Sequence, residues 1–331
     1  MDTTTDCSGW NTEGFFRRVS IAELENCLGK DVDPNARDED HRTPLHLSVY
    51  ANDPAVIGIL LGAGADIEAQ DRVGRTPLHT AAASASDLPV ITTLLDARAN
   101  PNAQTKSGLT PLHLAAKYAD DPAILTALLD AGAGPNTRDS TRWTPLHLAA
   151  KYASSPAIIA ALRASGAEPN GIDGRSRTPL HVAVENAADP TIIAALITGG
   201  ANPNVRTTVG LTPLHLAVRA KDLVILTALQ AAGADSNART GEGRTPLHLA
   251  AASAAGPDII AVLAAAGADP DKRTADGRTS LHLAVYVQDP ITIDALRSVG
   301  TDPDARDEYG MTALDLALEH GADPAIISAL R

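Results

Sequence analysis

Thr110-Pro111-Leu112-His113-Leu114-Ala115-Ala116 is the stretch that decides the fold, because its first four residues recur along almost the whole chain. Thr-Pro-Leu-His begins at residues 43, 76, 110, 144, 178, 212 and 245, and the altered forms Thr-Ser-Leu-His and Thr-Ala-Leu-Asp begin at 279 and 312. Successive copies lie 33 or 34 residues apart. A fixed period of this length indicates one small structural unit repeated in tandem.

Each copy predicts the start of a helix. Threonine is a favourable N-cap residue, and proline is well tolerated at the first helical position, where its missing N–H costs nothing. The residue two after each Thr is Leu in all nine copies, and the residue five after it is Ala in eight, Ser48 being the exception. The small side chains predict a close approach between neighbouring helices.

A second helix is predicted later in each period. It begins at Asp-Pro or Ser-Pro pairs, continues with apolar pairs such as Ile124-Leu125 and Leu128-Leu129 that share one helical face, and stops at a glycine. The Asp-Pro or Ser-Pro pairs begin at residues 53, 121, 155, 189, 289 and 323, and the glycines are residues 64, 132, 166, 200, 233, 267 and 300. A loop with turn residues, such as Asp71 to Arg75, leads to the next Thr.

These residues resemble the ankyrin repeat, in Thr-Pro-Leu-His-Leu-Ala-Ala at 110–116, Leu-Leu-x-x-Gly-Ala-x-x-Asn at 128–136 and Asp-x-x-Gly-Arg-Thr at 71–76. The resemblance covers residues 11–331. It implies an all-α solenoid, in which helix-turn-helix units joined by β-hairpin-like loops form one ankyrin-repeat domain over residues 1–331. We expect an N-terminal capping unit at 1–34, eight full repeats at 35–311 and a C-terminal capping unit at 312–331. The Ala-rich, Asp-Pro-punctuated style resembles bacterial members of the family.

Some positions depart from the family pattern. The hairpin glycine is replaced by His41, Arg142 and Ser176, which predicts local distortion of the tight turn at these three places. The 34-residue spacings imply one extra residue in the turn between the two helices. In the first unit, Phe15 and Phe16 are expected in the first helix, and Ser20-x-x-Glu23 forms a capping box that opens the second.

Composition excludes several classes of partner. Of 331 residues, 44% are hydrophobic but only 3% aromatic, so the core must consist of Ala, Leu, Ile and Val in thin layers. A formal net charge of −13 repels nucleic acid and anionic lipid. Apolar stretches are short and interrupted by Pro, Gly or charge, which predicts no membrane insertion. We expect a monomer that binds neither nucleic acid nor membrane.

The histidines raise the question of a metal site. Eight of the ten occupy the fourth position of the repeated tetrapeptide. Adjacent helical layers are roughly 8–10 Å apart, which is too far for two such side chains to share an ion with ligands about 2 Å away. We therefore expect hydrogen-bonded structural histidines. Because no catalytic motif is present, we also expect no enzyme activity, no cofactor and no metal.

Aromatic residues give the partner-binding prediction. Outside the N-terminal unit they occupy the eighth or ninth position after the repeat start (Tyr50, Tyr118, Tyr152 and Tyr286) or a hairpin (Trp143 and Tyr309). The resemblance implies that these positions line the concave groove and its rim, where targets dock. The predicted partner-binding residues are Lys117, Tyr118, Arg142, Trp143, Lys151 and Tyr152 in the middle repeats, followed by Glu185 and Arg219. The partner is a protein or peptide.

Three alternatives remain open at this point. The tyrosines and lysines could form an ordinary solvated face, in which case the chain is a structural spacer or scaffold. An enzyme or small-molecule binder would need a deep pocket with convergent polar groups. A row of hairpin arginines, at residues 37, 138, 206, 239, 273 and 306, is explained for half its members by pairing with the Asp that follows, or else indicates an acidic partner.

The two cysteines bear on localisation. Cys7 precedes the first predicted helix and Cys27 lies near the end of the second, and these two points are neighbours in an antiparallel helix pair. A disulfide would favour an exported protein, periplasmic or secreted. Two free thiols, with Cys27 as a small core residue, would favour a cytoplasmic one.

Overall fold

The computed structural model describes residues 7–84 and 88–331. The chain forms two compact units, residues 1–174 and 175–331, and each is described by itself. Within the described residues there are 20 α-helices and no strand, so the predicted all-α repeat fold is confirmed. The connecting loops are turns. One domain over the whole chain stays a prediction.

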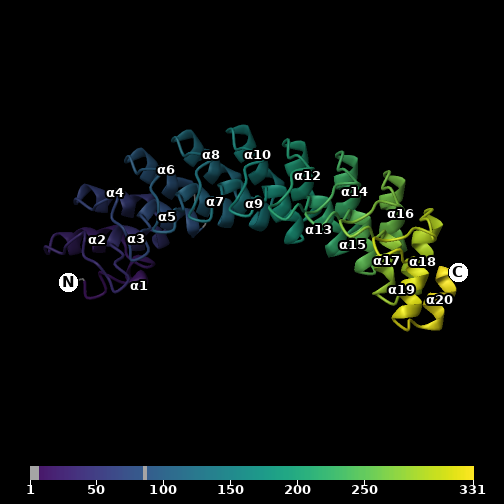
Figure 1. Cartoon of the computed structure of the whole chain (residues 1–331). Helices are drawn as coiled ribbons and strands as arrows, with labels where there is room; N and C mark the ends of the chain where they lie inside the picture. The colour runs from purple at the N-terminus through teal and green to yellow at the C-terminus, as the bar shows by residue number, and fades with distance from the viewer. Residues whose placement is uncertain (1–6, 85–87) are drawn as a thin grey trace. The chain divides into compact units, whose positions relative to one another are not determined.

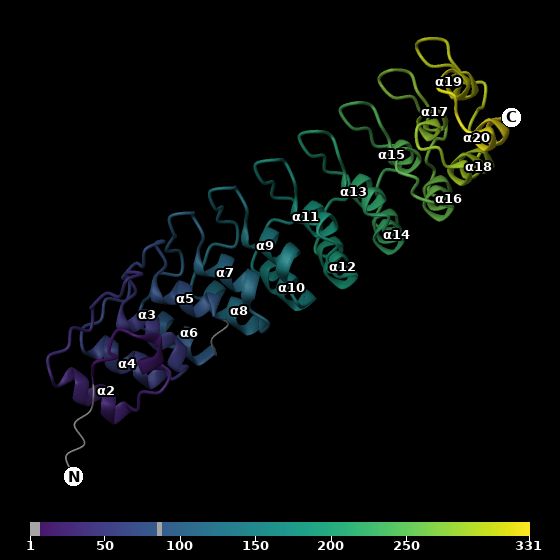
Figure 2. The same cartoon turned by 90° about the horizontal axis from the view of Figure 1, so that it is seen from below.

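In both units, consecutive helices form the two members of each repeat (Figures 1 and 2). The first unit contains α1 (Glu13–Phe16), α2 (Ile21–Leu28), α3 (Pro44–Ser48), a 3₁₀ turn (Val49–Ala51), α4 (Pro54–Gly62), α5 (Pro77–Ala83), α6 (Leu88–Asp96), α7 (Pro111–Tyr118), α8 (Pro122–Asp130), α9 (Pro145–Tyr152) and α10 (Pro156–Ala164). The second unit contains α11 (Pro179–Glu185), α12 (Pro190–Thr198), α13 (Pro213–Ala220), α14 (Leu223–Ala231), α15 (Pro246–Ala252), α16 (Pro257–Ala265), α17 (Ser280–Val285), α18 (Pro290–Ser298), α19 (Ala313–Glu319) and α20 (Pro324–Leu330).

The helices for which a cap residue was predicted begin directly after that residue. Thr110 has extended backbone angles and its hydroxyl accepts the N–H of His113, while Pro111 takes the first helical position of α7. The second helix of the same repeat is capped by Asp121, whose carboxylate accepts the N–H of Ala123 at 2.8 Å. Such caps satisfy N–H groups that a helix leaves unpaired at its start. Each helix is short, so the caps fix its start within the repeat.

The second helices end at left-handed residues. All seven predicted glycines have positive φ, between 81° and 92°. In the repeat that lacks this glycine, Arg98 takes the same place with φ 71°. A glycine reaches this conformation without strain because it has no Cβ, which is why this position favours it.

The predicted distortion at the hairpins without glycine is wrong. His41, Arg142 and Ser176 simply adopt positive φ, between 58° and 66°. At Arg142 the turn closes as it does at Gly74, because the N–H of Arg142 donates to the carbonyl of Asp139 at 2.9 Å. The Asp139 carboxylate also accepts the N–H of Trp143 at 2.8 Å. A side-chain acceptor that braces the turn allows a non-glycine residue to hold the left-handed conformation.

Helices of the same kind pack on one another, so that α3, α5, α7 and α9 form one row of the first unit and α4, α6, α8 and α10 a second row (Figure 2). The Leu two residues after each repeat start is at most 1% exposed in the first eight copies. Burying one such side chain contributes roughly 2 kcal/mol. In the last copy, Leu314 is half-buried.

Buried histidines join each repeat to the next. His79 accepts the backbone N–H of Thr76 on Nδ1 at 3.1 Å, which leaves Nε2 to donate to the carbonyl of Leu109 at 3.0 Å. Six further histidines bond in the same way, from Nε2 to a backbone carbonyl of the next repeat at 2.9 to 3.2 Å. They are His46, His113, His181, His215, His248 and His282. The prediction of hydrogen-bonded structural histidines is confirmed.

Asparagines form a second set of bonds between repeats, which the sequence analysis missed. Asn237 donates from Nδ2 to the carbonyl of Gly267 at 2.8 Å, and its Oδ1 accepts the N–H of Asp269 at 2.8 Å. The same pair of bonds is made by the asparagines at positions 35, 102, 136 and 204. One planar amide thus satisfies both the carbonyl of the glycine that ends a second helix and an N–H two residues after that glycine.

The hairpin arginines bond to backbone carbonyls. Arg239 donates to the carbonyl of Arg273 at 2.8 Å, and Arg206 and Arg273 donate likewise to the hairpin one repeat further on. Arg37 donates to the carbonyl of Gln70 at 2.7 Å, not to the Asp that follows it. Pairing with the next Asp is therefore wrong for Arg37. The carbonyl oxygens of the next hairpin provide a fixed acceptor one repeat away.

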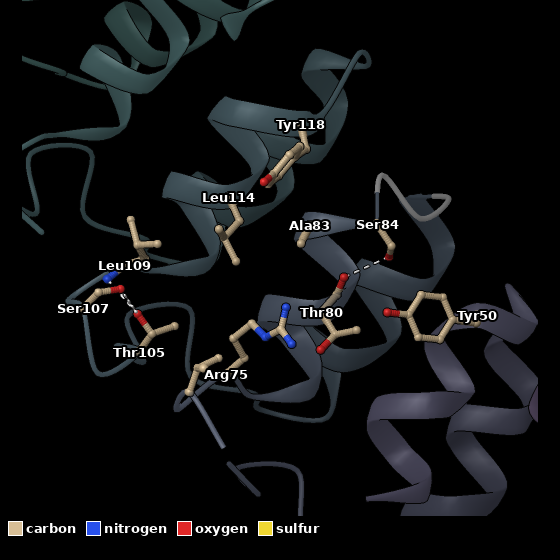
Figure 3. A pocket seen from close by; sticks show the side chains of 11 residues that line it. Tyr50, Arg75, Thr80, Ala83, Ser84, Thr105, Ser107, Leu109, Leu114 and Tyr118 are labelled. Carbon is tan, nitrogen blue, oxygen red and sulfur yellow. Dashed lines mark hydrogen bonds between the residues drawn. The ribbon is translucent and has the colours of Figure 1, made fainter. Parts of the chain in front are cut away.

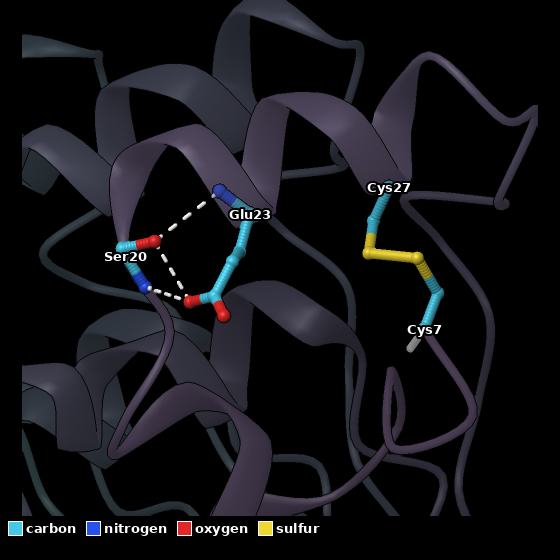
Figure 4. Close-up of a disulfide and its surroundings, with 4 residues drawn as sticks. All are labelled: Cys7, Ser20, Glu23 and Cys27. Carbon is cyan, nitrogen blue, oxygen red and sulfur yellow. Dashed lines mark hydrogen bonds between the residues drawn. A yellow bond between two sulfur atoms is a disulfide. The ribbon is translucent and has the colours of Figure 1, made fainter. Parts of the chain in front are cut away.

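The first repeat forms a small aromatic cap. Trp10 and Phe16 are buried, their ring centroids lie 5.8 Å apart, and Trp10 Nε1 donates to the carbonyl of Asp33 at 3.0 Å. Figure 4 shows the capping box at the start of α2, in which the Ser20 hydroxyl accepts the N–H of Glu23. The figure also shows a disulfide that joins the loop before α1 to the end of α2, with the Cα atoms of Cys7 and Cys27 5.8 Å apart.

Candidate partner-binding surface

The last turns of α7 and α9 carry the same sequence, Lys-Tyr, 34 residues apart. Because these two helices are neighbours in the stack, Lys117 and Tyr118 lie beside Lys151 and Tyr152. Trp143 stands just before the repeat start that opens α9. We call these five side chains the Lys-aromatic surface.

Cations and rings alternate along the Lys-aromatic surface. Lys117 Nζ lies 4.6 Å from the ring centroid of Tyr118 and 5.0 Å from that of Tyr152. Lys151 Nζ lies 4.9 Å from the Tyr152 centroid and 5.9 Å from that of Trp143. Each contact of this kind contributes about 0.5–1 kcal/mol at an exposed site. The four contacts hold the side chains in a defined arrangement before any partner arrives.

The rings nevertheless remain accessible. Tyr118 is 46% exposed and Tyr152 is 44% exposed. Trp143 is half-buried, stacked on the ring of His147 at 5.9 Å, and its Nε1 donates to the carboxylate of Asp173 at 3.2 Å. The indole is therefore fixed in orientation while the tyrosine rings present their faces to solvent.

The other predicted residues are placed as follows. Arg142 is exposed at the hairpin beside Trp143, in the first unit. Glu185 and Arg219 belong to the second unit, where both line a hollow of about 190 Å³. Glu185 accepts a charged hydrogen bond from Arg177 at 2.5 Å. The structure thus brings together five of the eight residues as one surface and places two others beside a separate hollow.

A hollow of about 460 Å³ adjoins Tyr118, and the sequence analysis did not predict it. Figure 3 shows Tyr50 and Tyr118 on different sides of it, together with the side chains of Arg75 and Leu114 that also line it. It is also lined by Val73, Thr80, Ala83, Ser84, Thr105, Ser107 and Leu109. The only sequence signal was an apolar Val at a hairpin tip, in a place where polar residues are usual.

The histidines with a lowered pKa are buried in the hydrogen-bonded ladder, where burial disfavours the charged imidazolium. Over residues 7–84 and 88–331, no three His, Cys, Asp or Glu side chains are grouped so that they could hold a metal ion. In the same part of the chain no helix has both the length and the apolar character needed to cross a membrane.

Comparisons with known proteins agree with this geometry. The family described as "Ankyrin repeats (3 copies)" matches residues 20–105, 81–173, 112–207 and 180–274, and "Ankyrin repeat" matches residues 276–308. A search of curated proteins gives no match. Among solved structures, the ankyrin repeat domain of Bcl-3, described as a unique member of the IkappaB protein family, is similar with a TM-score of 0.62 and 27% identity. The match covers 68% of this chain and 99% of that one.

Proposed function

Since this chain belongs to the ankyrin-repeat family, we propose that it binds a protein or peptide partner through the Lys-aromatic surface of its first unit, with Arg142 at the edge. Ankyrin repeats are generally protein–protein interaction modules. Glu185 and Arg219 are proposed to contribute a contact of their own in the second unit.

One observation carries the proposal. Tyr118 and Tyr152 are nearly half exposed although they are among the few aromatic side chains of the protein, and two lysines contact their rings. Tyrosine, tryptophan and arginine are the residues that most often dominate binding energy at interfaces. Rings that are already ordered lose little conformational entropy on binding, so more of their contact energy appears as affinity.

The test is the triple variant Tyr118→Ala, Trp143→Ala and Tyr152→Ala, compared with the wild type in affinity capture. We expect the variant to lose partner capture while its helical circular dichroism and melting curve stay close to those of the wild type. Tyr118 and Tyr152 are nearly half exposed and lie outside the buried Leu and Ile positions, so their removal leaves that core intact.

A matched control removes three exposed apolar side chains elsewhere, namely Leu223, Val224 and Ile291, at the starts of α14 and α18. This control variant should capture the partner as the wild type does. Equal capture by all three proteins would support a structural spacer in place of a binding module. Loss of helicity in the triple variant would show that the rings are structural.

A further inference from the structure

We infer that each unit carries one docking hollow for an acidic peptide segment with a branched aliphatic side chain, and that the two hollows are equivalent. The inference rests on the proposed function in one respect, namely that the partner is a polypeptide. It goes beyond it by assigning a second site, in which Arg219 is the only residue that the sequence had already indicated for partner binding.

The two hollows are built from the same register positions of the repeat. The first, of about 460 Å³, is lined by Val73 and Leu114, and the second, of about 450 Å³, by Val209 and Leu249. Each Val stands three residues before a repeat start, at the hairpin tip, and each Leu four residues after the next repeat start. Each hollow therefore spans two successive hairpins and the helix that follows them.

The residues just before the repeat starts complete the correspondence. In the first hollow they are Arg75 and then Leu109, and in the second Leu211 and then Arg244. The order of arginine and leucine is reversed, but each hollow keeps one of each. Both hollows also contain a threonine five residues before the second repeat start, at positions 105 and 240.

Valine at the hairpin tip is what distinguishes these two places. The tip positions of the other seven repeats are Asp40, Ser107, Thr141, Arg175, Glu242, Asp276 and Tyr309. Val73 is 51% exposed and Val209 is 61% exposed. A branched apolar side chain at the rim of an apolar hollow gains burial only when a second apolar group enters from outside.

Charge decides the chemistry of the occupant. The chain as a whole carries a net charge of −13, yet Arg75 and Arg219 line the hollows. In the second hollow Arg244 is paired with Glu242 at 3.1 Å, whereas Arg219 forms no ion pair within the described residues. In the first, Arg75 is paired with Asp71 at 2.7 Å, and Lys106 adds a positive charge next to Val73, where its Nζ donates to the carbonyl of Arg72. Each hollow thus combines an apolar floor with a surplus cation, which complements an acidic segment.

The experiment uses the full chain with methyl-labelled valine and leucine, and the probe is the peptide acetyl-Asp-Glu-Leu-Glu-Asp-amide. We expect its addition to shift the methyl resonances of Val73 and of Val209, with apparent dissociation constants within about tenfold of each other because the two sites share their geometry. The response should weaken as salt is added. The charge-reversed peptide acetyl-Lys-Lys-Leu-Lys-Lys-amide and the peptide with Gly in place of Leu should shift neither resonance.

Two substitutions separate the sites. Val209→Asp should remove the response in the second unit by at least about tenfold in affinity while the Val73 response persists, and Val73→Asp should do the reverse. The control is Val224→Asp, because Val224 is 62% exposed, almost the same as Val209, but lines neither hollow. Val224→Asp should leave both responses unchanged.

Several outcomes would overturn the inference. A response at only one valine would do so, as would equal shifts with the charge-reversed peptide or equal effects of Val224→Asp and Val209→Asp. Shifts that depend on protein concentration in the absence of peptide would also overturn it, because they would identify a second copy of the chain as the occupant. Failure of the proposed function looks different, because partner capture would then survive the triple alanine variant while the Val209 response remained. Absent peptide responses with intact, aromatic-dependent capture would reject this inference alone.

Discussion

Acidification should weaken this fold through its buried histidines before most carboxylates are protonated. Burial lowers the pKa of His79 and of His215 to about 4, although the carbonyl that each bonds in the next repeat favours protonation. The backbone N–H of the N-cap threonine points at Nδ1 in both cases. A proton placed there would face a donor, and the charge would be buried.

The direction of the change in stability with pH follows from the folded-state pKa of these histidines, which lies below the value of about 6.5 in an unfolded chain. These histidines therefore stabilise the fold fully above about pH 6.5, and their contribution is lost as the pH falls from 6.5 towards 4. At pH 5 the unfolded side chain is nearly fully protonated and the folded one nearly neutral. Each of the two should then take up about 0.9 proton on unfolding, which corresponds to a loss of about 2 kcal/mol relative to pH 7.5.

Proton uptake is the assay, because it does not require the repeats to unfold in a single step. The protein is unfolded with urea in weakly buffered solution at pH 5 and titrated back to its starting pH, and His79→Gln and His215→Gln are compared with the wild type. Each variant should take up about one proton fewer at pH 5, and all three proteins should take up almost none through these groups at pH 8. Unchanged uptake at pH 5 in both variants would refute the reasoning.

Three further predictions concern stability. Asn237→Ala removes two bonds to the next repeat and should lower the free energy of urea unfolding by about 2 kcal/mol; a change near zero would contradict this ladder. Gly267→Ala should lower the stability measured in thermal melts by about 1 kcal/mol, because alanine is strained at its positive φ although no atom crowds the added Cβ. Gly210→Ala should lower it distinctly more, because there the added Cβ would also lie 2.7 Å from a backbone nitrogen. Reduction should lower local stability, read by hydrogen exchange, by about 3 kcal/mol for a 20-residue separation, and a Cys7→Ser, Cys27→Ser variant should not respond to reductant.

The predictions that held depend on local chemistry repeated in register. Thr110 caps α7 through an interaction that spans three residues, and Gly132 ends α8 by its own backbone angle. Neither needs a distant neighbour, so each can be recognised in the sequence. Nine copies of the same signals also fixed the period, and with it the expectation that His113 and its equivalents share one structural role.

The predictions that failed concern groups whose hydrogen-bond partners could not be identified from the sequence. Arg37 was assigned to the adjacent Asp, but in the structure it reaches a carbonyl of the following hairpin. Arg142 was expected to distort its turn, yet the carboxylate of Asp139 braces the backbone there. In both cases the sequence shows the donor, and only the folded geometry shows which acceptor is nearer.

The candidate site divides in the same way. The sequence identified Tyr118, Trp143 and Tyr152 as residues outside the Leu and Ile core positions, and their placement on one surface followed from the 34-residue period. It did not reveal that Lys117 lies between two rings, nor that Val73 borders a hollow. Those features require the spacing and rotation between successive repeats.

By itself, then, the order of residues determined where most helices start and where most second helices end, because caps, prolines and left-handed glycines act within a few residues. It also determined which helix faces are apolar, since these follow from the periodicity of the sequence alone. Tertiary structure decided which polar groups meet between repeats and where the surface is hollowed. The physical reason is that hydrogen bonds and cavities depend on distances of a few tenths of an ångström between segments about 30 residues apart.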